Sequence, residues 1–301
     1  MNDVIFFMKK VLYWIASIVA VIFVAEYNSI NVVASNATNK ARLNISKIDS
    51  SKYSIAGEMF PFMHKKHLQN YKSYEYFIVR KTPENEYLVR KSQTLFQVIV
   101  PILHKYGVPE DFKYLAVLES GLDKSQVSTM NAVGVWQLMK QTAESCGLTV
   151  TSENDERLDL EKSTIAVCKL LKAHKREFGT WTEALLAYNM GNTALATFQK
   201  RAQNYDDVYR LNIYKESMSC IYKLVAYKTL FKNLNKYGFK STNAYNESFK
   251  SLILTRPIKD LQKYALKNHI DIDMLMYNNH WIKANHIEAS RKKKYILKIP
   301  K

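Results

Sequence analysis

The sequence of 301 residues is poor in the residue types that mark disulfide-linked or turn-rich folds, with 3 cysteines, 8 glycines and 6 prolines. The cysteines, at positions 146, 168 and 220, are odd in number and form no CxxC pair. They therefore support neither a disulfide framework nor a zinc site, and we expect small buried apolar side chains. The scarcity of glycine and proline favours long helices over many tight turns.

Negative charge is also scarce. The chain has 44 Lys and Arg against 27 Asp and Glu, a formal net charge of +17. A basic surface attracts polyanions such as nucleic acid, anionic lipid or an acidic cell-wall polymer. The lysines are spread along the whole chain and no nucleic-acid-binding motif is present, so we expect no nucleic-acid partner. The histidines form no HExxH pair, and we expect neither a metal site nor a cofactor.

One long uncharged run stands at the N-terminus. MKK at residues 8–10 precedes VLYWIASIVAVIFVA, from Val11 to Ala25. A run of about 15 residues has the length of a signal-peptide core and is short for a membrane span. No cysteine precedes Cys146, which excludes a lipoprotein. We expect residues 1–25 to be a signal peptide or membrane anchor, and the protein to be exported to the periplasm or cell envelope, tethered at the inner membrane if the segment is uncleaved.

Composition and periodicity divide the rest of the chain into three parts. Residues 26–58 are polar, rich in Asn and Ser, and are expected to form a linker. Helical periodicity predicts a mainly α-helical domain over residues 59–236, with its core at 92–232. The segment 249–301 has β-like runs at both ends and two helical patterns between them. This strand, helix, helix, strand order predicts a small separate α/β module.

Three local features of the helical domain are also predicted. Pro101 should kink or divide a helix over residues 92–107. A further helix is expected over residues 132–147. Thr182 is expected to cap the helix that contains WTEALLAYNM.

A single carboxylate interrupts an apolar pattern in LAVLESGL, residues 115–122. Pro109 favours a helix start and Gly121 a helix stop, so Glu119 lies in the last turn, on or beside the buried stripe. Partial desolvation and the negative end of the helix dipole should both raise its pKa. Such an acid can protonate a leaving-group oxygen, as in a glycosidase, although a satisfied buried glutamate is the alternative. The nearby Asp123 lies past the helix stop and is expected to be structural.

Three downstream segments place Glu119 in a larger pattern. ESGLDKSQVSTMNAVGVWQLM begins at Glu119, and AYNMG and YKESM follow it. In this order and spacing they resemble the lytic transglycosylases of bacterial cell walls, over about residues 108–231. The resemblance implies a lysozyme-like helical catalytic domain. The C-terminal segment, 249–301, resembles the LysM-like module of the same family, which implies glycan binding, with a purely structural appendage as the alternative.

The resemblance also implies roles for individual residues. Glu119 matches the catalytic acid and base. The positions that match substrate-binding or groove-lining residues are Ser120, Ser128, Gln137, Met139, Tyr188, Asn189 and Glu216.

For several of these residues a structural interpretation stays open. Ser120 can satisfy backbone groups at the helix end. Trp136 and Met139 suit a core as well as a groove. Glu216 can pair with a neighbouring lysine at the surface. Asn131 stands where the family usually has glycine, and because asparagine tolerates the left-handed conformation we expect the turn to survive.

The resemblance implies cleavage of the MurNAc–GlcNAc β-1,4 bond of peptidoglycan without water. Glu119 would protonate the leaving oxygen and then deprotonate the 6-hydroxyl of MurNAc, which attacks C1 and gives a 1,6-anhydro-MurNAc end. One carboxylate suffices because the nucleophile is intramolecular. Two alternatives stay open: a lysozyme-like hydrolase on the same fold, and a catalytically silent peptidoglycan-binding protein.

Overall fold

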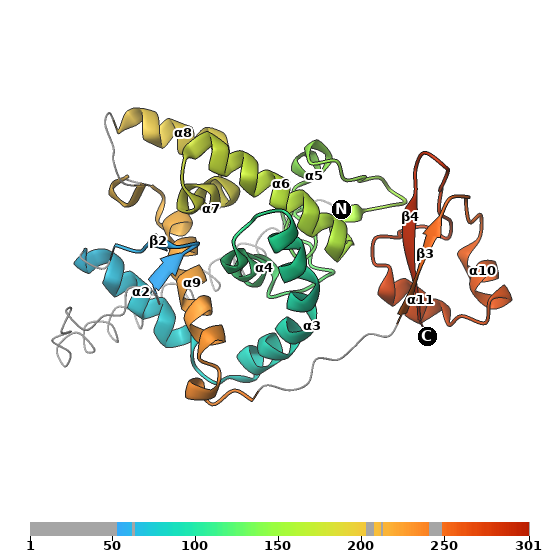
Figure 1. Cartoon of the computed structure of the whole chain (residues 1–301), viewed down its shortest axis with the longest axis horizontal. Helices are drawn as coiled ribbons and strands as arrows, with labels where there is room; N and C mark the ends of the chain where they lie inside the picture. The colour runs from blue at the N-terminus through green and yellow to red at the C-terminus, as the bar shows by residue number, and fades with distance from the viewer. Residues whose placement is uncertain (1–52, 62–63, 203–207, 212, 241–248, 301) are drawn as a thin grey trace, which may run out of the picture.

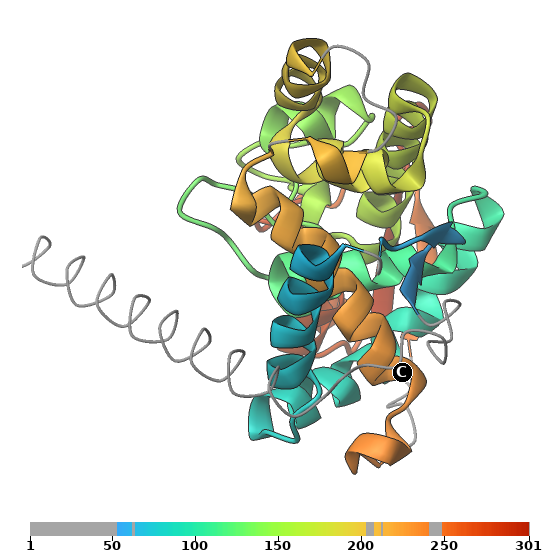
Figure 2. The ribbon, with the colours of Figure 1, turned by 90° about the vertical axis from the view of Figure 1, so that its left-hand side faces the viewer.

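The computed structural model describes residues 53–61, 64–202, 208–211, 213–240 and 249–300 (Figures 1 and 2). The expected signal peptide or membrane anchor, residues 1–25, lies outside these ranges. None of the helices in the described part combines the length and apolarity that crossing a bilayer requires.

The larger part of the structure is a helical domain, which confirms the predicted mainly α fold. Its longer helices are α2 (Lys65–Ile78), α3 (Pro83–Lys105), α4 (Lys113–Ser120), α6 (Leu160–Phe178), α7 (Trp181–Met190), α8 (Asn192–Arg201) and α9 (Lys215–Lys232). Its shorter helical elements are η3 (Glu110–Phe112), α5 (Lys140–Ser145), η4 (Glu156–Leu158), η5 (Val208–Arg210) and η6 (Asn235–Tyr237). Helix α2 lies along α9, and α6 packs against both α3 and α7 (Figure 2).

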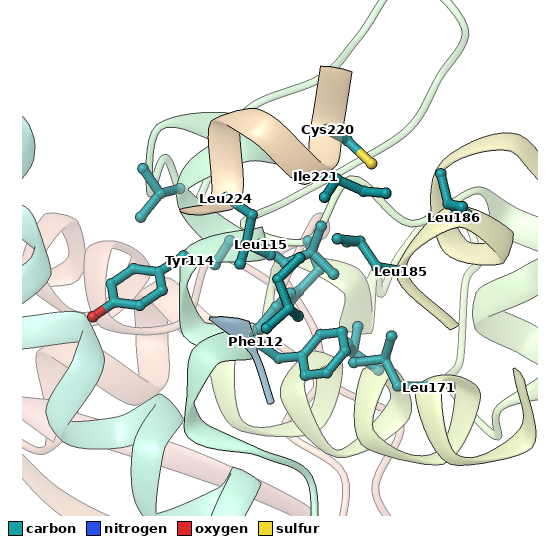
Figure 3. Close-up of a cluster of buried hydrophobic side chains, with 14 of the residues drawn as sticks. Phe112, Tyr114, Leu115, Leu171, Leu185, Leu186, Cys220, Ile221 and Leu224 are labelled. Carbon is teal, nitrogen blue, oxygen red and sulfur yellow. The ribbon is translucent and has the colours of Figure 1, made fainter. Parts of the chain in front are cut away.

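The short helix α4 lies at the centre of the hydrophobic core. Leu115 and Ala116 on α4 are fully buried. Side chains from α6, α7 and α9 meet them, including Leu171, Leu185 and Ile221 (Figure 3). The segment that carries Glu119 is thereby held on several sides by packed helices.

Helix α3 is not divided at Pro101, which was one of the two outcomes predicted for this proline. It runs from Pro83 to Lys105 with Pro101 inside it. Pro101 is exposed, so the carbonyl that loses its hydrogen bond can face water. Leu95, Ile99 and Leu103 pack the opposite face into the core, and this packing outweighs the local cost of proline.

The predicted helix over 132–147 is wrong for its first half, and the predicted cap of α7 is wrong by two residues. Only Lys140–Ser145 (α5) is helical, because Gly134 and Gln137 have positive φ angles of 80° and 48°. Thr180, rather than Thr182, accepts from the backbone N–H of Glu183 in a capping box.

Part of the expected linker is a folded hairpin. Strands β1 (Ser54–Ile55) and β2 (Glu58–Met59) pair antiparallel. The buried Lys228 on α9 donates to the Ser54 carbonyl at 2.7 Å and to the Asp111 carboxylate at 2.6 Å. Residues 53–58 therefore belong to the helical domain, because their backbone completes a buried ion-pair network.

The hairpin also caps a helix of the domain. The carboxylate of Glu58 accepts from the backbone N–H groups of Trp181 and Thr182 at 2.6 and 2.8 Å. Negative charge at a helix N-terminus is favourable because the first N–H groups of a helix have no partner within the helix. Glu58 thus ties the hairpin to the start of α7.

The C-terminal module has the predicted strand, helix, helix, strand order. It comprises β3 (Phe249–Leu254), α10 (Leu261–Lys267), α11 (Ile272–Asn278) and β4 (Tyr295–Pro300). The two strands pair antiparallel with Phe249 opposite Pro300. Trp281 stacks on Tyr295 in the core of the module, with ring centroids 4.9 Å apart.

The module packs directly on the helical domain, beside the start of α6 (Figure 1). Val133 and Leu158 of the helical domain belong to the same buried cluster as Trp281 and Ile282. The backbone N–H of Asp155 donates to the Trp281 carbonyl at 2.8 Å. The two parts therefore share a core and a backbone hydrogen bond.

Candidate active site

The carboxylate of Glu119 is partly buried in the last turn of α4, where the sequence placed it. Gly121 ends the helix in the left-handed conformation, with φ of 57°. Burial raises the pKa of Glu119 to about 7, and no neighbouring charge in the described residues contributes. The group is mainly a neutral acid below pH 7, which is the form that can donate a proton.

A non-helical loop, residues 126–139, follows α4 in the sequence and folds back on itself through bridges from Val133 to Val127 and Leu138. Asn131 has a φ of 60°, which confirms the expectation that asparagine keeps the left-handed turn. We refer to this segment as the 126–139 loop.

Ser120 and Tyr188 attach the 126–139 loop to the helices around Glu119. The Ser120 hydroxyl donates to the Val135 carbonyl at 2.8 Å. The Tyr188 hydroxyl, from α7, donates to the Trp136 carbonyl at 2.5 Å. Burial raises the pKa of Tyr188, and the nearby Glu119 raises it further. Both residues thus lie at the site, with a structural hydrogen bond that supports the loop.

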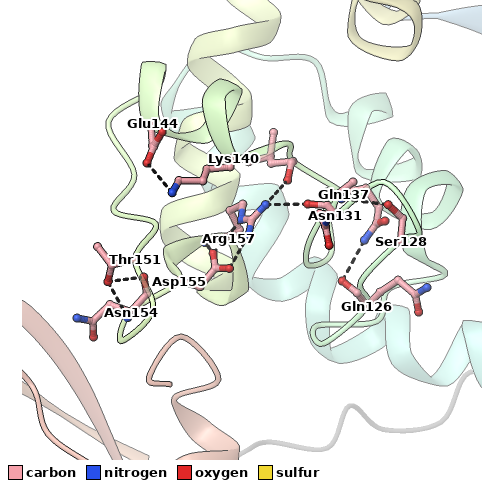
Figure 4. Close-up of polar contacts among 12 residues, drawn as sticks. Gln126, Ser128, Asn131, Gln137, Lys140, Glu144, Thr151, Asn154, Asp155 and Arg157 are labelled. Carbon is pink, nitrogen blue, oxygen red and sulfur yellow. Dashed lines mark hydrogen bonds and ion pairs between the residues drawn. The ribbon is translucent and has the colours of Figure 1, made fainter. Parts of the chain in front are cut away.

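Ser128 and Gln137 shape the loop from within. The Ser128 hydroxyl accepts from the Ala132 N–H at 3.0 Å, and the Gln137 amide donates to the Gln126 and Gly134 carbonyls at 3.2 and 2.9 Å (Figure 4). Ser128 and Gln137 are partly exposed. They can therefore also meet a ligand.

Trp136 and Met139, for which both a core and a groove position stayed open, differ in burial. Trp136 is fully buried, and its indole N–H donates to the Thr164 hydroxyl at 2.9 Å. Met139 is exposed. Trp136 is therefore a core residue, and Met139 is available to a groove.

Asn189 and Glu216 lie at the ends of other helices and are both exposed. Asn189 stands in the last turn of α7, and Glu216 in the first turn of α9. In the described part of the chain, no ion pair includes Glu216, so the surface pairing considered for it is not formed. Cys220 lies one turn further along α9. Burial raises the pKa of its thiol, and the nearby Glu119 raises it further.

Sequence reasoning missed a buried charged cluster that contacts the loop. Asp155, Glu156 and Arg157 are each less than 10% exposed, at 8%, 5% and 7%. Arg157 reaches the 126–139 loop, and Glu156 pairs with Lys162 at 2.5 Å. In the sequence this cluster lies in the hexapeptide NDERLD, which directly precedes an amphipathic helix. Its four charged residues are also typical of a solvated turn, so the pattern did not distinguish the two.

Two protein families match the chain. The transglycosylase SLT domain matches residues 99–210, and the soluble lytic transglycosylase C-terminal LysM-like domain matches residues 250–301. The chain is 27% identical over 192 residues to membrane-bound lytic murein transglycosylase D of Escherichia coli K12. The aligned region covers 62% of this chain and 42% of that protein. The same protein of Escherichia coli O6:H1 gives the same values. The chain spans less than half the length of these relatives.

Proposed function

Because the chain carries a transglycosylase SLT domain and a LysM-like domain of the soluble lytic transglycosylase type, we propose that it is a lytic transglycosylase of the bacterial cell envelope. Its substrate is the glycan strand of peptidoglycan. The observation that carries the proposal is Glu119, a carboxyl group whose pKa burial raises to about 7, inside the segment that matches the SLT domain.

In the proposed reaction Glu119 acts twice. It first gives its proton to the oxygen of the MurNAc–GlcNAc bond, and the acetamido group of the substrate assists the charge that develops at C1. The resulting carboxylate then takes the proton of the MurNAc 6-hydroxyl, whose oxygen attacks C1. The products are a free GlcNAc end and a 1,6-anhydro-MurNAc end, with no water consumed. A nucleophile within the same sugar removes the need for a second protein carboxylate.

The surroundings of Glu119 suit this double role. Asp123, the next carboxylate along the chain, is engaged by the N–H and hydroxyl of Ser125 at 2.8 Å. It is therefore a turn residue, as expected. The 126–139 loop, which Ser120 and Tyr188 attach to the helices around Glu119, offers further groups that can bind the sugar. These are Ser128, Gln137 and the exposed Met139. The exposed Asn189 and Glu216 are also proposed to bind substrate.

The products of cell-wall digestion test the proposal. Mass spectrometry of walls treated with the protein should show anhydro-MurNAc ends. Glu119→Gln should lower the rate by about 10²–10⁴, the range for removal of a general acid. The control is Glu110→Gln, at an exposed glutamate in η3 just before α4, and it should change the rate little. Reducing ends would indicate a hydrolase, and wall binding without any wild-type cleavage would indicate a silent binding protein.

We propose that residues 1–25 direct the chain to the envelope, either as a cleaved signal or as an anchor in the inner membrane. The relatives bear the name membrane-bound, which agrees with an anchor. Fractionation of cells and N-terminal sequencing of the mature protein separate the two cases. Recovery of the full-length chain in the cytosol would contradict both.

A further inference from the structure

Side chains from outside the 126–139 loop bind several of its carbonyl oxygens. Ser120 and Tyr188 bind one each, as described above. Arg157 binds two, because its Nη1 donates to the carbonyls of Asn131 at 3.0 Å and Leu138 at 3.1 Å. These two carbonyls lie at the two ends of residues 131–138, so one guanidinium holds both ends of this segment (Figure 4).

The guanidinium of Arg157 is itself held in place. Its Nε and Nη2 donate to the two carboxylate oxygens of Asp155 at 2.9 and 2.7 Å. Both side chains are buried, so water screens the pair little. A bidentate pair fixes the plane of the guanidinium, and therefore fixes the direction in which it presents its remaining N–H groups to the loop.

The loop needs an external support. Asn131 and Gln137 have positive φ angles, of 60° and 48°, a conformation that costs free energy in residues other than glycine. Gly134 lies directly against the backbone of Arg157, where an added Cβ would be 2.3 Å from the Arg157 carbonyl oxygen. The loop is thus seated on the segment that carries Arg157 as well as bound by its side chain.

We propose that Arg157, oriented by Asp155, is a positioning residue that holds the 126–139 loop in the shape that binds the glycan beside Glu119. This inference rests on the proposed function, which assigns the substrate to that loop. Arg157 touches neither the sugar nor the acid. It acts on binding, through the positions of Ser128 and Gln137.

Two variants and a matched control test the inference. Arg157→Met removes all the donors, while Arg157→Lys keeps the charge but cannot bind both carbonyls and Asp155 in the same way. The control is Lys228→Met, which breaks another buried ion pair, the one with Asp111 that supports the hairpin. The measurements are KM and kcat on soluble glycan strands, and hydrogen–deuterium exchange of residues 126–139, both well below the melting temperature.

For Arg157→Met we expect KM to rise on the order of tenfold with a smaller change in kcat, since misplaced binding groups weaken productive binding. Exchange in the loop should accelerate, Arg157→Lys should recover part of both effects, and Lys228→Met should change neither. An unchanged KM in both Arg157 variants, or loop exchange no faster than in the control, would overturn the inference. If the wild type released no anhydro ends, the proposed function would fail, and the exchange comparison would still decide whether Arg157 holds the loop.

Discussion

At the scale of single residues, the important property of Glu119 is that burial alone raises its pKa to about 7. Among the described residues, no cation or second carboxylate contributes to its shifted pKa. A group controlled only by desolvation has a protonation state that depends on how well water is excluded. It also carries a cost for the folded protein, because ionisation in a buried place is unfavourable.

That cost predicts a pH-dependent effect of Glu119→Gln on stability. Burial raises the pKa of Glu119 from 4.5 in the unfolded chain to about 7 in the native protein, so the native state binds the extra proton between these values. The wild type therefore loses stability as pH rises from about 4.5 through about 7. Glutamine does not ionise, and the variant should be more stable by up to about 3 kcal/mol at pH 8.

Urea unfolding at pH 4 and pH 8 measures the difference. At pH 4 the two proteins should have nearly equal free energies of unfolding, since both carry a neutral side chain. Asp123→Asn is the control, because the hydrogen bonds from Ser125 favour its ionised form. Equal free energies of the Glu119 variant and the wild type at both pH values would contradict a raised pKa.

At the scale of elements, the sequence predicted the helices, whose apolar residues recur at regular spacing, and missed the 126–139 loop, which has no such pattern. The helices have apolar residues at regular spacing, and Glu119 was found because it interrupts such a pattern. The predicted helix over 132–147 includes the second half of the 126–139 loop, where VGVWQLM is apolar except for Gly134 and Gln137. The true shape of the loop depends on Arg157, 19 residues beyond Leu138, and on backbone carbonyls that every residue has, so no local pattern reveals it.

The close contact of Gly134 with the backbone of Arg157 predicts the effect of Gly134→Ala. The added Cβ would lie 2.3 Å from a backbone oxygen, and φ at this position is 80°. We expect a loss of about 2–4 kcal/mol of stability, with a lower rate on glycan, because backbone must shift. Gly107→Ala is the control: its φ is also positive and its Cβ would meet nothing within 4 Å. Thermal unfolding should show a loss of about 1 kcal/mol there, and equal losses in the two variants would contradict the close contact.

At the scale of the whole molecule, the helical domain holds a partner segment at each end of the described chain. The hairpin at residues 53–60 is bound through Lys228 and Glu58. The C-terminal module is bound through the buried cluster around Trp281, and through an ion pair of Lys298 with Glu161 at 3.0 Å. The sequence indicated two separate parts, because the strand, helix, helix, strand order of residues 249–301 by itself predicts a small separate module. It gave no sign that they share a core.

The shared core predicts that the two parts unfold together. Trp281→Ala should lower the free energy of unfolding by about 3–5 kcal/mol, the usual range for a buried aromatic side chain. Calorimetry should still show one transition, at a lower temperature, because Val133 and Leu158 lose their contacts at the same time. Leu266→Ala on the exposed side of α10 should change little. A separate early transition of the module would contradict this prediction.

The contact between Val133 and the module also has an evolutionary consequence. Val133 belongs to the 126–139 loop and, at the same time, to the buried cluster of the C-terminal module. A change of size at position 133 should be matched by a change elsewhere in this cluster, for example at Trp281 or Ile282, since packed interiors tolerate volume changes poorly. These positions should therefore co-vary among chains in which the two domains are docked. A helical domain that lost or exchanged its module would be left with the apolar side chain of Val133 in water, within the 126–139 loop itself.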